Sequence, residues 1–124
     1  MSEPQELRPL PPAGGHYRHA VRRGSLVFTS GQLGWDDDRR FPDGIEAQTR
    51  QALENLRRAL ALEGATLDDL VSVFVYLADL EMFPRYNEVY RDVIPVDPPA
   101  RTSVGATLPP GALIEITGVA VVGE

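Results

Sequence analysis

The sequence of 124 residues contains no cysteine. This absence excludes disulfide bonds, thiolate nucleophiles and metal sites with cysteine ligands. Apolar runs are also short, and none approaches the roughly 20 residues that a membrane-spanning helix requires. Residues 1–6 lack the basic region and apolar core of a secretory signal. We therefore expect a soluble cytoplasmic protein that does not bind membranes.

Basic charge is scarce as well. Lysine and arginine total 12 against 18 aspartate and glutamate residues, which gives a formal net charge of -6 and an isoelectric point near 4.9. On average such a chain repels a phosphate backbone, so we expect no nucleic-acid partner. With 43% hydrophobic residues, it has the size and composition of a single domain over residues 1–124.

One arginine stands at the entrance to the longest uncharged stretch of the chain. Pro98 and Pro99 restrict the backbone before Arg101, and small or β-branched residues follow it, so we expect a rigid turn leading into a strand. A guanidinium group held in place suits a two-point grip on a carboxylate. The alternative is an ordinary surface arginine after a turn, since most charged side chains face water.

Glu115 is the only charged residue between positions 102 and 123. It lies in the middle of residues 113–122, which are otherwise apolar or small. An acid at such a position is costly to bury without a partner. Glu115 is therefore expected to be paired, to face a cleft or to be functional.

The apolar periodicity predicts an α+β fold with the element order ββαβαββ. Residues 1–15, rich in proline and glycine, are predicted to form a loosely ordered arm. The expected strands cover residues 17–22, 25–30, 70–78, 102–107 and 113–122, and the expected helices cover residues 45–63 and 82–93. We expect a mixed sheet with both helices packed on one face. The other face would be apolar and bare, which predicts a homo-oligomer.

The two helices carry clear side-chain patterns. In the first, mostly apolar residues recur at spacings of three and four on one face: Ile45, Thr49, Ala52, Leu53, Leu56 and Leu60. The pairs Glu46 with Arg50 and Glu54 with Arg58 are predicted on its other face, and Gly64 is the expected stop. In the second helix, one face is expected to hold Phe83, Tyr86, Tyr90 and Val93.

Three smaller features have both structural and functional interpretations. Gly31 follows a predicted strand, where it either permits an unusual φ or lets another group approach the backbone. The acidic residues 36–38 lack the alternating spacing of a calcium loop, so a solvated loop is expected. His16 and His19 would point to opposite sides of an extended segment, so we expect no metal site there.

Six short segments form a pattern from Tyr17 onward. They are Tyr17 with Ala20 and Val21, residues 26–32, residues 48–56, residues 87–90, residues 99–104 and residues 113–116. Each alone is a weak signal. In this order and at this spacing, they resemble the Rid family of reactive intermediate deaminases, also called the YjgF family.

The resemblance implies a chorismate-mutase-like fold and a homotrimer whose sheets form a central barrel. It further implies clefts between subunits in which small imino acids are hydrolysed to keto acids and ammonia without a cofactor. In the family pattern, Arg101 binds the substrate carboxylate and Glu115 places or activates water. The positions that would complete the pocket are Tyr17, Ser30, Gly31, Asn87 and Ser103.

The residues themselves leave other roles open at three of these positions. Tyr17 also suits a half-buried strand position, because tyrosine often bridges core and solvent. Ser103 has no histidine in a convincing relay and suits an ordinary strand residue. Asn87 equally suits an amide on a helix surface.

The chain departs from the family pattern in three places. Residues 15–19 read Gly-His-Tyr-Arg-His where the family commonly has Gly-Pro-Tyr-Ser-Gln, which predicts extra positive charge from Arg18 and His19 at the pocket edge. Residues 101–108 form a segment one residue shorter than usual, and Thr117 replaces a second glutamate. These departures concern the identity of the substrate more than the fold.

Two functions from different classes follow. In the first, the protein is a hydrolytic deaminase of reactive 2-imino and 2-enamino acids. In the second, the same trimer binds a small carboxylate or a protein partner without turnover. A ribonuclease role, sometimes proposed within the family, is disfavoured by the acidic charge and by the lack of a basic surface with aromatic residues.

Overall fold

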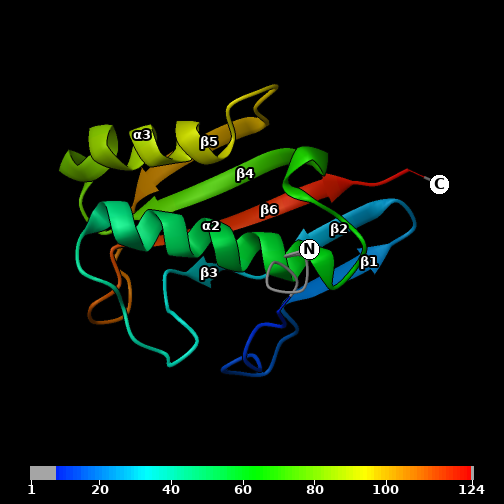
Figure 1. The fold of residues 1–124 in the computed structure, drawn as a ribbon, viewed down its shortest axis with the longest axis horizontal. Coiled ribbons are helices and arrows are strands. Elements are labelled where there is room, and N and C mark those ends of the chain that lie inside the picture. The colour runs from blue at the N-terminus through cyan, green and yellow to red at the C-terminus, as the bar shows by residue number, and fades with distance from the viewer. Residues whose placement is uncertain (1–7, 124) are drawn as a thin grey trace.

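The computed structural model describes residues 8–123, in which one six-stranded sheet is covered on one face by two helices (Figure 1). The elements are β1 (Ala20–Arg23), β2 (Leu26–Thr29), β3 (Gln32–Leu33), α2 (Ile45–Ala61), β4 (Leu70–Leu77), α3 (Phe83–Val93), β5 (Ala100–Gly105) and β6 (Ile114–Val121). Short 3-10 helices, η1 (Leu67–Asp69) and η2 (Leu80–Met82), precede β4 and α3. The predicted α+β class, with two helices on a mixed sheet, is confirmed.

The sheet runs in the order β1-β2-β6-β4-β5, and β3 pairs with β6 beyond the end of β2. Only β4 and β5 pair in parallel. Their register places Arg101 opposite Val73, whereas Glu115 of β6 lies opposite Tyr76 of β4. Because paired residues share a face, this register decides on which side of the sheet each functional candidate lies.

Helix α2 buries the predicted apolar stripe against the sheet. Ile45, Leu53, Leu56 and Leu60 are almost completely buried. The helix ends at Ala61, and Gly64 follows with a φ of 81°, a conformation that glycine adopts without strain. The expected stop is confirmed, three residues after the last helical residue, Ala61.

The predicted pair of Glu46 and Arg50 on α2 is wrong. Arg50 instead lies 3.4 Å from Asp92 of α3, and Glu46 lies 4.0 Å from Arg85 of the same helix. Helix α3 runs beside α2, so acidic and basic groups on the neighbouring helix compete with those one turn away (Figure 1). Both residues form ion pairs with helix α3 and not with each other within α2.

Arg58 departs further from the expectation of a solvent-facing side chain. It is 3% exposed, and its guanidinium donates to Asp37 and to Asn55, each at 2.9 Å. It also lies 4.0 Å from Glu54, so the predicted pair is present but long. Asp37, expected in a solvated loop, therefore neutralises a buried cation.

The N-terminal segment has less strand than predicted. Strand β1 begins at Ala20, so Tyr17 lies before it, and Gly24 makes the hairpin turn with a φ of 60°. Residues 8–15 form no helix or strand. Their carbonyls accept hydrogen bonds from the body of the protein: Pro9 from Arg58, Pro11 from His19 and Pro12 from Arg39. The remaining residues of the predicted arm, 1–7, lie outside the described part of the chain.

Two strand assignments differ from the prediction. Strand β3 has only two residues, too few for any periodicity, and it was missed. Strand β5 covers Ala100–Gly105 rather than residues 102–107, because six successive residues pair with β4. Arg101 is therefore the second residue of the strand, which begins directly after Pro98 and Pro99.

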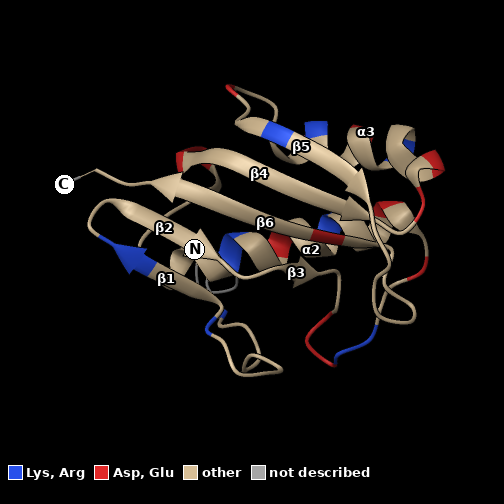
Figure 2. Ribbon diagram, turned by 180° about the vertical axis from the view of Figure 1, so that it is seen from behind, with Lys and Arg blue, Asp and Glu red and all other residues tan. Residues whose placement is uncertain are grey.

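The face of the sheet away from the helices is open and apolar. Figure 2, seen from behind, shows strands β2, β6, β4 and β5 in front of α2 and α3, with no element over them. The exposed apolar side chains on these strands include Leu26, Phe28, Phe74, Val104 and Val121. Among the described residues, no helix has the length and apolarity to cross a membrane.

We predict that Asp37→Asn destabilises the protein by about 1–2 kcal/mol, because it removes the charged partner of the buried Arg58 guanidinium. The loss is modest because the side chain at position 37 is partly exposed to water. Arg58 holds the pKa of Asp37 below its ordinary value, mainly through a hydrogen bond. The stabilisation is present above the ordinary pKa of about 3.9 and is lost as the pH falls through the lowered pKa. Urea unfolding at several pH values measures this.

Asp38→Asn is the matched control, since Asp38 is exposed in the same loop. It should leave the free energy of unfolding unchanged at every pH. An equal loss in both variants at neutral pH would contradict a specific role for the bond between Arg58 and Asp37.

Candidate functional site

Arg101 lies under helix α3, on the helix-covered face of the sheet. Its partner in the register, Val73, is fully buried on that face. The guanidinium carbon lies 5.5 Å from the ring centroid of Phe83, 5.4 Å from that of Tyr86 and 4.6 Å from that of Tyr90. These three rings form an aromatic cage, which holds the cation by cation–π attraction.

The orientation of Arg101 is fixed without an acidic partner. Its Nη1 donates to Asn87 Oδ1 at 2.9 Å. None of the ion pairs within residues 8–123 includes Arg101. A guanidinium has more N–H donors than the Asn87 oxygen and the Tyr86 hydroxyl can take, so it retains donors for an anion.

A surface pocket opens beside this group. Its lining combines polar and apolar residues: Asn87, Tyr90, Arg91, Ile94, Pro95, Pro98, Pro99 and Arg101. The proline pair that singled out Arg101 in the sequence thus forms one wall of the pocket. The arrangement is suited to a small molecule with one carboxylate.

Ser103 follows Arg101 on the same face of β5. Its Oγ lies 3.0 Å from the hydroxyl oxygen of Tyr86. Burial raises the pKa of Tyr86, and it raises that of Tyr90 to about 12, so both phenols keep their protons at neutral pH. The hydroxyl of Tyr90 is buried without a hydrogen-bond partner in the described part of the structure.

Glu115 lies on the opposite, open face of the sheet. It pairs in the register with Tyr76 on one side and with Leu33 on the other. The side chain is half-buried, and desolvation alone raises the pKa of its carboxyl group. A carboxylate whose pKa moves up towards neutrality becomes a better proton acceptor for a catalytic step.

Gly31 lets Glu115 approach the backbone. A Cβ atom at Gly31 would overlap the Glu115 carboxylate. The φ of Gly31 lies outside the left-handed region. Of the two interpretations of this glycine, close approach of another group is therefore the one that the structure supports.

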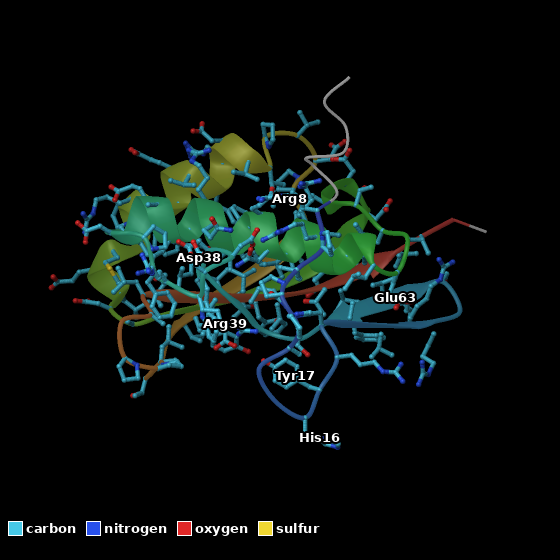
Figure 3. All side chains as sticks on the ribbon, turned by 60° about the horizontal axis from the view of Figure 1, so that its bottom comes forward. Arg8, His16, Tyr17, Asp38, Arg39 and Glu63 are labelled. Carbon is cyan, nitrogen blue, oxygen red and sulfur yellow. The ribbon has the colours of Figure 1, made fainter. Side chains whose placement is uncertain are left out.

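Tyr17 and Gly31 share a second pocket, which lies beneath the N-terminal segment. Its lining also includes Leu10, Pro11, His19, Trp35 and Arg39. In Figure 3 the Tyr17 side chain turns back beneath the body of the protein, whereas His16 projects away from it. Tyr17 is half exposed and precedes β1, so it is a pocket residue of irregular backbone rather than a strand aromatic.

The remaining candidates near this pocket are held by backbone groups. Ser30 Oγ donates to the Arg18 carbonyl at 2.7 Å, so its hydroxyl proton is already used. His19 contacts the Pro11 carbonyl at 2.7 Å and the Gln32 amide at 3.3 Å, which ties the N-terminal segment down. Within residues 8–123, no three His, Asp or Glu side chains gather into a metal-binding group.

The predicted site residues thus form two groups in one chain. Arg101, Asn87 and Ser103 lie under α3 on the covered face, and Glu115 with Gly31 lies at the open face. We call them the arginine half-site and the glutamate half-site. One small molecule cannot touch both through the sheet of a single chain.

The sequence interpretation missed the aromatic cage. Phe83, Tyr86 and Tyr90 were assigned only to one face of a helix. Their spacing of three and four was a usable signal, because it lines them up opposite whatever the adjacent strand presents. What could not be inferred was that β5 would present a cation there.

The comparisons with known proteins agree with this geometry. The model of the family described as Endoribonuclease L-PSP matches residues 8–122. This chain belongs to the L-PSP family. Structures with the names YjgF and RidA share its fold, so the resemblance to the Rid (YjgF) family and the chorismate-mutase-like fold are confirmed.

Relatives of this L-PSP protein come from distant organisms. The mitochondrial protein mmf2 of Schizosaccharomyces pombe is 41% identical over 86% of this chain and 88% of its own length. A RutC family protein of Saccharolobus solfataricus is 41% identical over 86% of each chain.

Two solved structures extend the likeness in three dimensions. TdcF of E. coli, solved with bound serine, superposes with a TM-score of 0.87 at 32% identity and covers 92% of this chain and 94% of its own. RidA of an Antarctic Psychrobacter gives a TM-score of 0.86 at 36% identity, with 91% and 94% covered.

We predict that Glu115→Gln raises the free energy of unfolding at neutral pH, because it removes a desolvated charge. The raised pKa means that the folded state holds the Glu115 proton more tightly than the unfolded state does. The parent protein therefore loses stability as the pH rises from the pKa of Glu115 in the unfolded chain, about 4.3, through its higher pKa in the folded protein. Below this window the two proteins should unfold alike, as measured in urea.

Glu88→Gln, at an exposed position of α3, serves as the control and should show no such pH-dependent gain. Equal stability of the Glu115→Gln variant and the parent across the whole pH range would mean that Glu115 is well solvated.

Proposed function

We propose that this protein is a homotrimeric deaminase that hydrolyses reactive 2-imino and 2-enamino acids to 2-keto acids and ammonia at sites between subunits. The observation that carries the proposal is Arg101, a caged and unpaired guanidinium that opens into a pocket. Such a group is suited to bind a carboxylate, which every 2-imino acid carries.

A relative supports the carboxylate assignment. TdcF of E. coli was solved with bound serine, an amino acid with a free carboxylate. By likeness of fold and sequence, we propose that a small amino-acid-like carboxylate is the ligand class here. Asn87 would hold the Arg101 guanidinium in the orientation that binds this carboxylate, and Ser103 lies beside Arg101 on the same face of β5.

The location of the sites between subunits follows from the two half-sites. Glu115 must reach the ligand from a second copy, because in its own chain the sheet separates it from Arg101. The open apolar face provides the surface for such an assembly, with Phe28, Phe74 and Val121 exposed on it. A closed ring of three copies would place each arginine half-site beside a neighbour's glutamate half-site.

The proposed reaction needs water and no cofactor. Water, positioned by Glu115 of the neighbouring copy, adds to the imine carbon: one of its protons passes to the Glu115 carboxylate, and the imine nitrogen takes up a proton from solvent. The carbinolamine nitrogen then takes the proton back from Glu115, the C–N bond breaks with release of ammonia, and the hydroxyl group loses its proton to solvent as the keto acid forms. Imines already hydrolyse in water, so holding the carbon and the water in line supplies the acceleration.

Two other functions are distinguished by simple assays. A binding module without turnover would hold a keto acid through Arg101 but release no ammonia from imines generated by an amino-acid oxidase. The family description names an endoribonuclease, and cleavage of RNA would be its measurable sign. The net charge of -6 favours the small carboxylate over RNA as the ligand.

We predict that Arg101→Lys loses about a hundredfold in imine turnover, nearly as much as Arg101→Ala, because a flexible point charge cannot make a two-point grip worth about 3 kcal/mol. Both variants should keep the mass of a trimer in light scattering. Ammonia release gives the turnover.

Arg91→Lys is the matched control, since Arg91 lines the same pocket outside the aromatic cage. It should retain nearly full turnover. A fully active Arg101→Lys variant would defeat the carboxylate grip, and dissociation of both Arg101 variants would make Arg101 an interface residue instead.

A further inference from the structure

A part-buried pair of hydroxyl groups lies beside the arginine half-site. Tyr86 of α3 is 0% exposed, and its oxygen lies 3.0 Å from Oγ of Ser103 on β5. Ser103 stands two residues after Arg101 in the strand, so both side chains point to the same face. The Tyr86 ring also forms part of the aromatic cage, 5.4 Å from the guanidinium carbon.

The direction of this hydrogen bond follows from what surrounds it. Arg101 can only donate, so it cannot accept the phenol proton, and its charge and hydrogen bond lower the pKa of Tyr86 against the larger effect of burial. Burial keeps the phenol protonated, and the Ser103 oxygen, 3.0 Å away, is the acceptor that the described structure gives its proton. If Ser103 donated instead, the phenol proton would be buried without an acceptor, which is unfavourable. The phenol therefore donates to Ser103.

We propose that Tyr86 is a positioning residue that turns the Ser103 hydroxyl proton outward, where it donates to the ligand carboxylate that Arg101 grips. This inference rests on the carboxylate-binding role in the proposed function. The serine oxygen accepts one bond from the phenol, so its own proton is available for a ligand. Ser103 would thus add a further hydrogen bond to the carboxylate of a 2-keto or 2-imino acid whose two oxygens Arg101 grips.

The alternative is that the pair only ties α3 to β5. Such a tie would affect stability and leave ligand affinity unchanged. The chain supplies a matched comparison in Tyr90, which belongs to the same aromatic cage and whose hydroxyl has no partner among the described residues. Removal of the Tyr90 hydroxyl changes the cage without touching the Ser103 hydrogen bond.

The test measures binding of 2-oxobutanoate, a keto acid that is not turned over, to the intact protein by calorimetry. Tyr86→Phe and Ser103→Ala should each weaken binding, by up to about tenfold, the range of one neutral hydrogen bond. The double variant should be no weaker than Ser103→Ala alone, because both changes remove the same hydrogen-bond chain. Tyr90→Phe should weaken binding less than Tyr86→Phe does, and Ser103→Thr, which keeps a hydroxyl, should bind more tightly than Ser103→Ala.

In imine assays the Tyr86→Phe variant should raise KM more than it lowers kcat, since the contact serves binding. Unchanged affinity in Tyr86→Phe, with only a lower unfolding temperature, would overturn the proposal in favour of a structural tie. Equal losses in Tyr86→Phe and Tyr90→Phe would overturn it as well, because the cage and not the hydroxyl pair would then be responsible.

Failure of the proposed function would be seen separately. If the parent binds 2-oxobutanoate through Arg101 but releases no ammonia from imines, the deaminase proposal fails and the Tyr86 test stands. If binding does not depend on Arg101, the inference about Tyr86 and Ser103 is overturned.

Discussion

Side chains alternate between the two faces of a β-strand, and this constraint separates Arg101 from Glu115. Arg101 shares the helix-covered face with its register partner Val73, and Glu115 shares the open face with Tyr76. A shift of one residue in either strand would reverse the assignment. The same alternation leaves an apolar face without cover. We propose that one arrangement accounts for both consequences: a neighbouring copy covers the open face and brings its glutamate half-site to the arginine half-site.

The arginine half-site combines rigidity with an unused charge. An acidic partner would hold Arg101 equally well but would occupy the donors that a ligand needs. Aromatic rings and the Asn87 amide hold the cation through its face and a minority of its N–H groups, so other N–H groups stay available for a ligand. Burial raises the pKa values of Tyr86 and Tyr90 and keeps both phenols neutral. A phenolate beside Arg101 would compete with a carboxylate ligand for the guanidinium.

Much of the architecture could be predicted from the sequence, because apolar periodicity, turn residues and the stop at Gly64 are local signals. Arg101 and Glu115 were identifiable as anomalies, a cation after two prolines and an acid in an apolar strand. The inward turn of Arg58 and the pair of Tyr86 with Ser103 depend on contacts between segments distant in sequence, so no local pattern reveals them. Strand β3 was missed because two residues carry no period. The sequence also did not show on which face of the sheet Arg101 lies, because this depends on the register between β5 and β4.

Complementation between inactive variants tests most directly whether each site combines half-sites from two copies. Arg101→Ala and Glu115→Gln protomers would be unfolded together, refolded as a 1:1 mixture and assayed for ammonia release from imines. Random assembly into rings unites the two intact half-sites at one interface in four, so about a quarter of the parent turnover should return. Each variant refolded alone should remain inactive. A mixture as inactive as its components would show that Arg101 and Glu115 of a single chain serve the same site, and would contradict the account.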